Sequence, residues 1–94
     1  MQLTKQELSL LNYSLQTSGT SEAGQPVIRN FSVGQLKMAI DIFDKLKANT
    51  KEEVFVDGEL KLTTEEKTFM LGLINRPWSL EDGRVKLELE KKLS

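Results

Sequence analysis

The chain has 94 residues, of which 29% are charged and 38% hydrophobic, and its net charge is −1. This length predicts one small domain, and the composition is typical of a folded globular chain rather than a disordered one. There is no cysteine and no histidine, which excludes disulfides, the usual zinc sites and Ser-His or Cys-His relays within a single chain.

The near-neutral charge disfavours a general nucleic-acid binder, because such proteins usually carry a basic patch. No apolar run approaches the roughly 20 residues needed to span a bilayer, and the N-terminus lacks the apolar core of a signal peptide. We therefore expect a soluble, cytoplasmic protein with a single domain over residues 1–94, without a cofactor, a metal or a membrane partner.

The first predicted helix begins at Thr4. The Thr4 hydroxyl can accept a hydrogen bond from the backbone N–H of Glu7 while the Glu7 carboxylate reaches back, which is a capping box. Apolar residues then follow at helical spacing, namely Leu8, Leu11 and Leu15. The helix should end near Gln16, ahead of a Ser-Gly pair.

Residues 17–26 predict an exposed loop, because glycine, serine and proline dominate and no apolar period is visible. Val27–Ile28 could be a short extended piece that docks on the core. A connection of this length is unusual in a small bundle. It is either a functional loop or a tolerated insertion.

The second predicted helix begins at Ser32, which forms a second box with Gln35. Its main apolar stripe comprises Leu36, Ala39, Ile40, Phe43 and Leu46. Met38 and Ile42 widen the apolar surface beyond one face. Such width predicts burial on two sides, either within a bundle or against another chain.

A β-hairpin is predicted at about residues 53–62. Val54–Val56 has strand-forming residues, and Asp57–Gly58 supplies the positive φ angles of a type I′ turn before Glu59–Leu62. A lone hairpin is marginal. It should pack on helices, join Val27–Ile28 as a third strand, or pair across an interface through its exposed edge.

The third predicted helix begins with another box, between Thr63 and Glu66, and ends before Pro77. The fourth begins at Ser79. Residues 85–90 alternate between apolar and charged, as a strand would, but the caps and the Glu, Lys and Leu content favour a helix.

Two segments of the chain resemble two later ones. Leu3–Glu7 resembles Leu62–Glu66, and Phe31–Val33 resembles Trp78–Leu80. The break between the helices is much longer in the first copy. Because capping rules alone favour these residue types, duplication and convergence both remain open.

These elements predict a mainly α fold, with four short helices arranged as two helical hairpins and one β-hairpin between them. The alternative is an α+β fold in which Val27–Ile28, the hairpin and the C-terminal alternating run form a small sheet.

Trp78, the only tryptophan, is either an anchor for a partner or a cap that packs over the end of the bundle. Arg76 beside it could bind an anion or stay solvated. The candidate partner-binding residues are Trp78, Arg76, Met38, Ile42, Val54 and Phe55.

The leading functional hypothesis is a non-enzymatic protein–protein interaction module, a regulatory or assembly factor that binds another protein or itself. Its paired carboxylates lie at helix N-termini, where the helix dipole explains them without catalysis. The alternative is a small DNA-associated regulator that uses the two C-terminal helices as a helix-turn-helix, although the last helix mixes acidic and basic residues.

Overall fold

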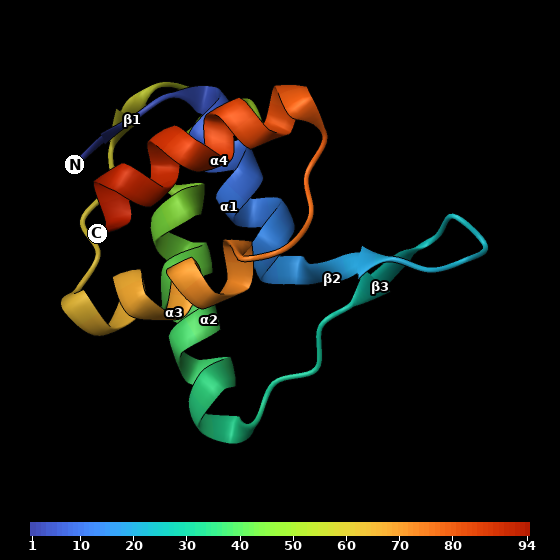
Figure 1. Ribbon diagram of the computed structural model, residues 1–94. Helices are drawn as coiled ribbons and strands as arrows, with labels where there is room; N and C mark the ends of the chain where they lie inside the picture. The colour runs from blue at the N-terminus through green and yellow to red at the C-terminus, as the bar shows by residue number, and fades with distance from the viewer.

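A computed structural model describes the backbone of residues 1–94 and every side chain except that of Thr20. Within these residues the chain forms four helices: α1 (Lys5–Gln16), α2 (Val33–Lys47), α3 (Thr64–Ile74) and α4 (Leu80–Leu93). Figure 1 shows α1 among the other helices, and α1 contacts each of them. Small antiparallel strand pairs accompany the helices, so the predicted fold class is confirmed.

The helix starts follow the chemistry predicted from the sequence. Three helices begin with a complete capping box, in which a Ser or Thr hydroxyl and the side chain three residues later satisfy two backbone N–H groups. The boxes join Thr4 with Glu7, Ser32 with Gln35 and Thr63 with Glu66. Helix α4 is capped by Ser79 and is continuous from Leu80 to Leu93, so the strand alternative for residues 85–90 is wrong.

The core lies where the four helices meet. Each helix contributes residues at helical spacing, which places them on one buried face. The buried hydrophobic residues are Leu3, Leu8, Leu10, Leu11, Leu15, Ala39, Ile42, Leu46, Leu60, Met70, Ile74, Leu89 and Leu93.

The hairpin between α2 and α3 lies earlier than predicted. Strand β4 (Thr50–Lys51) pairs with β5 (Val54–Phe55), and Glu52 and Glu53 form the turn with φ angles of 53° and 65°. The two glutamates therefore take the positive φ values that we assigned to Asp57–Gly58.

Asp57 and Gly58 serve a long-range contact instead of a turn. Strand β6 (Gly58–Glu59) pairs with the N-terminal strand β1 (Gln2–Leu3), and the Asp57 carboxylate accepts the backbone N–H of Lys5 at 2.7 Å. A Cβ on Gly58 would lie 2.4 Å from the Asn49 Oδ1 atom. Gly58 therefore lets the Asn49 side chain lie close against the backbone.

Residues 17–28 form a second hairpin, whereas we predicted a loop over residues 17–26 and a short extended piece only at Val27–Ile28. Strand β2 (Thr17–Thr20) pairs with β3 (Pro26–Ile28), and the hairpin projects away from the helices (Figure 1). Val27 and Ile28 are exposed, so the expectation that they dock on the core is wrong. The docking residue is Arg29, whose side chain donates to the carbonyls of Ser14 and Leu73.

The two resembling halves of the chain make matching contacts. Lys92 on α4 donates to buried Glu7 on α1 at 2.7 Å, and Lys45 on α2 donates to buried Glu66 on α3 at 2.6 Å. Lys45 and Lys92 lie at the same distance along the chain from the caps Ser32 and Ser79. The first helix of each half is thus tied to the second helix of the other.

The Glu66 carboxylate should stabilise the fold in a way that is lost in acid. Burial by itself would raise the pKa of Glu66, yet hydrogen bonds from Lys45 and Thr63, together with the Lys45 charge, hold it below the ordinary 4.5. A lowered folded-state pKa stabilises the fold above the unfolded pKa, and this stabilisation is lost as the pH falls through the folded value.

Glu66→Gln should therefore flatten the fall in the free energy of unfolding as the pH drops below about 4.5. Urea unfolding at several pH values measures this slope. Glu65→Gln, in the same turn but exposed, is the matched control and should keep the wild-type slope. Equal slopes in the wild type and Glu66→Gln would contradict the assignment.

Candidate partner-binding groove

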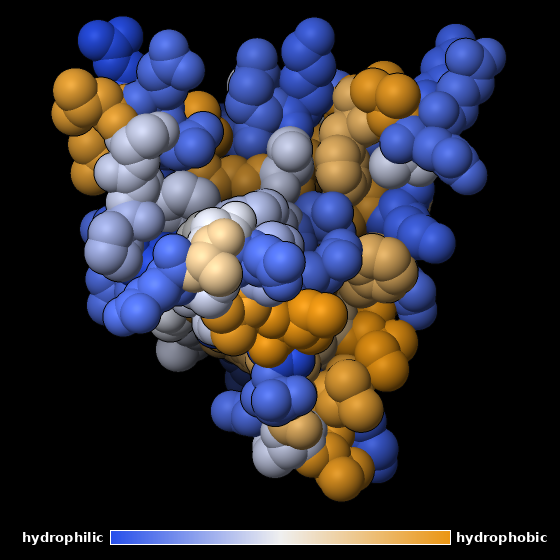
Figure 2. Space-filling model, turned by 90° about the vertical axis from the view of Figure 1, so that its right-hand side faces the viewer, coloured by the Kyte–Doolittle hydropathy of each residue, from blue (hydrophilic) through white to orange (hydrophobic). Residues whose placement is uncertain are grey.

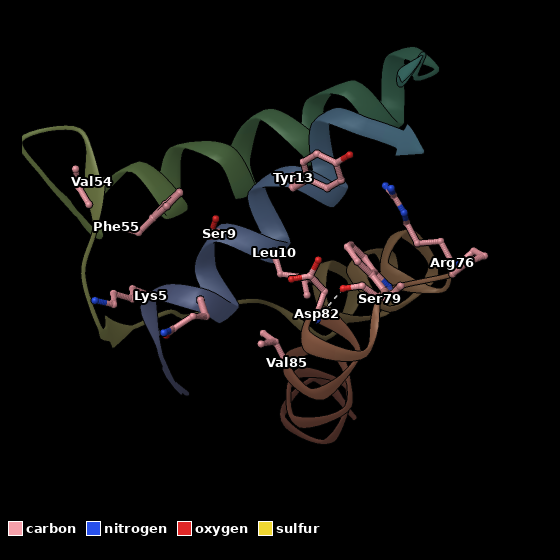
Figure 3. A pocket seen from close by; sticks show the side chains of 13 residues that line it. Lys5, Ser9, Leu10, Tyr13, Val54, Phe55, Arg76, Ser79, Asp82 and Val85 are labelled. Carbon is pink, nitrogen blue, oxygen red and sulfur yellow. Dashed lines mark hydrogen bonds between the residues drawn. The ribbon is translucent and has the colours of Figure 1, made fainter. Parts of the chain in front are cut away.

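An open groove of about 690 Å³ lies between α1, β5 and the connection from α3 to α4. In Figure 3, α1 runs along its middle, Val54 and Phe55 stand at one end, and Arg76 stands at the other. The lining residues are Lys5, Gln6, Ser9, Leu10, Tyr13, Val54, Phe55, Arg76, Pro77, Trp78, Ser79, Asp82 and Val85.

Helix α1 forms the floor because its two sides have different neighbours. Leu8, Leu11 and Leu15 point into the core. Ser9 and Tyr13 are one turn apart on another side, which lines the groove. The groove therefore combines a polar helix face with apolar and aromatic side chains from its two ends.

Arg76 is held in a fixed position at its end of the groove. Its guanidinium lies 5.0 Å from the centre of the Tyr13 ring and 4.7 Å from the Trp78 ring, which are cation–π distances. Its Nη1 donates to the Thr17 carbonyl at 3.0 Å. The Trp78 indole N–H donates to the Ile74 carbonyl at 2.9 Å, so the ring beside Arg76 is also anchored.

Arg29 and Arg76 both lie where the C-termini of α1 and α3 converge. Neither helix has a basic residue in its last turn, although a cation there is favourable to the helix dipole. The two arginines supply that charge from outside the helices. Burial, followed by the nearby charge of Arg76, lowers the pKa of Arg29 from its ordinary value, so the two guanidinium groups lie close enough to affect each other.

Three charged side chains line the groove, those of Lys5, Arg76 and Asp82. Among the described residues, the ion pairs involve neither Lys5, Arg76 nor Asp82. The Asp82 backbone N–H is already used, because it donates to the Ser79 hydroxyl at 3.2 Å as part of the α4 cap. The groove thus offers two cations near its ends and one carboxylate on its wall.

The structure brings four of the six predicted partner-binding residues into this groove, namely Trp78, Arg76, Val54 and Phe55. Met38 is half-buried against the core and borders a separate, smaller hollow. Ile42 is 0% exposed. It belongs to the core and cannot contact a partner in the folded chain.

The sequence alone did not indicate that Lys5, Leu10, Tyr13 and Val85 line a common groove. Tyr13 is the only tyrosine in the chain, and it stands outside the Leu stripe of its helix, which was the one signal available. In the structure its ring centroid lies 6.4 Å from that of Trp78, and both rings contact the Arg76 guanidinium.

The helix-turn-helix interpretation receives little support from the charges on α4. Lys86 pairs with Glu90, Lys91 with Glu88 and Lys92 with Glu7. A helix that reads DNA presents basic and amide groups to the major groove of the DNA, whereas these lysines already face carboxylates.

Within the described residues, no helix has both the length and the apolar character that crossing a bilayer requires. Comparisons of the chain with protein-family models, curated proteins and solved structures give no match.

Proposed function

We propose that this chain is a non-enzymatic protein-binding module, acting as a regulatory or assembly factor, whose groove holds an extended segment of a partner protein. The observation that carries the proposal is the convergence of Trp78, Arg76, Val54 and Phe55 on one groove from two separate parts of the chain. A cytoplasmic location, which suits the absence of cysteine, is part of the same proposal.

The lining supports a peptide with mixed chemistry. Val54, Phe55 and Trp78 offer apolar surface for aliphatic side chains, and Trp is enriched among binding hot spots. The guanidinium of Arg76 suits a carboxylate on the peptide, because Arg is already oriented by its two rings and needs little further ordering.

The strand at the end of the groove supports an extended conformation for the peptide. The Val56 N–H donates to the Asn49 carbonyl at 2.9 Å, and Phe55 pairs with Thr50 in the next position. Because bonded and non-bonded pairs alternate in an antiparallel ladder, the N–H and C=O of Phe55 point away from β4. That edge can accept an added strand.

Selection from a random peptide library displayed on phage tests the proposal. The wild-type chain should enrich peptides that carry an aliphatic residue and an acidic residue. Val54→Asp places a negative charge on the groove at an exposed position, so it should weaken binding of the selected peptides at least tenfold, about 1.4 kcal/mol.

Val56→Asp is the matched control, because Val56 is exposed two residues away and does not line the groove. It should bind the selected peptides as the wild type does. Failure to enrich any peptide, or equal loss in Val54→Asp and Val56→Asp, would contradict the assignment of the groove.

A further inference from the structure

Helix α2 carries an apolar stripe that the rest of the domain leaves uncovered. Val33, Leu36 and Ile40 are 74%, 47% and 49% exposed, and Phe43, which is partly buried, continues the row. Lys47 closes it, with its ammonium 5.0 Å from the centre of the Phe43 ring. Figure 2 shows hydrophobic residues gathered in the lower part of this face of the molecule, where α2 lies.

The fold itself does not require this stripe. Helices α2 and α4 occupy matching places in the two halves, with Ile42 and Leu46 buried in one and Leu89 and Leu93 in the other. The positions on α4 that match the stripe are Leu80, Gly83, Leu87 and Glu90. Two of these four lack an apolar side chain, so the continuous stripe is a property of α2 alone.

The spacing of the stripe is that of a coiled-coil seam. Val33, Leu36, Ile40, Phe43 and Lys47 follow one another at alternating steps of three and four residues, which is the a and d pattern of a heptad. Helix α2 has 15 residues, so the seam is about 22 Å long. A seam of this kind suits another helix better than an extended peptide.

The charges beside the seam indicate what that other helix is. Lys37 and Asp44 are exposed on the same flank, one heptad apart, and neither forms an ion pair within the described residues. If two copies of α2 lie antiparallel, Lys37 of each copy meets Asp44 of the other, and both pairs form at once. The opposite flank carries Ala39 and Leu46, which are buried in their own domain, so a parallel pair would gain no such charges.

We propose that the exposed stripe of α2 is a homodimer interface, in which two copies of this chain pair antiparallel about a twofold axis. The interface is separate from the groove, because its residues do not line the groove. It therefore stands independently of the peptide-binding function.

Sedimentation velocity over about 5 µM to 1 mM chain tests the dimer, because a seam this short supports a dissociation constant in the micromolar range. Ile40→Glu, and separately Val33→Glu, should raise the dissociation constant at least about tenfold. Leu87→Glu, at the position on α4 that matches Ile40, should leave it unchanged. A wild-type chain that stays monomeric throughout, or a dimer that Ile40→Glu and Val33→Glu leave intact, overturns the proposal.

Exchanging the charges of Lys37 and Asp44 tests the antiparallel pairing. A loss of fold stability could not produce the expected result, because a mixture of the two variants should regain association. Lys37→Glu alone and Asp44→Lys alone each place like charges opposite one another, so each should dimerise more weakly than the wild type. A mixture of the two variants restores both opposite-charge contacts and should form a heterodimer tighter than either homodimer. A mixture that associates no more tightly than the separate variants overturns the pairing.

Discussion

Ile42→Ala is expected to lower the free energy of unfolding by about 2–5 kcal/mol. Ile42 is fully buried on the core face of α2, and alanine would leave a cavity that the packed helices can fill only in part. A domain of this size is stabilised by only about 5–15 kcal/mol in total. The loss should therefore be plain in urea unfolding monitored by circular dichroism.

Ile40→Ala is the matched control, because it removes the same side chain two residues away on the same helix. Ile40 is 49% exposed, so the loss should not exceed about 1 kcal/mol when the chain is monomeric. Similar losses for the two variants would show that α2 is oriented differently on the domain. They would also remove the basis for placing a dimer seam on its outer face.

Arg29→Ala is expected to cost about 1.5–3 kcal/mol of unfolding free energy, the range for hydrogen bonds made by a charged group. Its guanidinium donates to the carbonyls of Ser14 and Leu73, which belong to the ends of α1 and α3. Truncation leaves both carbonyls without that donor and removes a cation from two helix C-termini. The change is measured by urea unfolding at neutral pH.

Arg84→Ala controls for the loss of an arginine as such. Arg84 is exposed on α4 and makes no ion pair within the described residues, so its removal should change stability by no more than about 0.5 kcal/mol. A loss for Arg29→Ala as small as that for Arg84→Ala would contradict the role of Arg29 in joining the helix ends.

The helices could be predicted because their starts depend on residues close together in the chain. A capping box needs only a Ser or Thr and an acidic or amide side chain three residues later, and Thr4 with Glu7 and Thr63 with Glu66 supply it. Their buried faces follow from the helical period. Local patterns were not enough for residues 85–90. Their alternation of apolar and charged residues also fits a strand, and it does not show that Leu89 is buried among the helices.

The strands could be placed only in part. Val27–Ile28 and Val54–Phe55 are extended as expected, but the partner of Gly58–Glu59 lies far away in the sequence, at Gln2–Leu3. Asp57–Gly58 has the local signature of a turn, but Gly58 pairs with Leu3 and packs against Asn49. The actual turn falls on Glu52 and Glu53, residues with no preference for positive φ. Tertiary pairing decided the outcome against the local pattern.

The groove could be anticipated only in pieces. The sequence indicated two separate candidates, a possible anchor at Trp78 with Arg76 and an exposed strand edge at Val54–Phe55. Nothing in the sequence showed that both would line one groove on α1. Apolar width on α2 was visible, but the helical period does not tell which side the domain covers. The structure buries Ile42 and leaves Ile40 exposed, which reverses the roles that we expected for them.

The most direct test of the peptide-binding groove is an NMR titration of the ¹⁵N-labelled chain with a peptide recovered by the library selection. The backbone amide signals of Phe55 and Arg76 and the indole N–H signal of Trp78 should shift. The amide signals of Val33, Leu36 and Ile40 on α2 should stay in place. Shifts confined to α2, or none in the groove at saturating peptide, would contradict it.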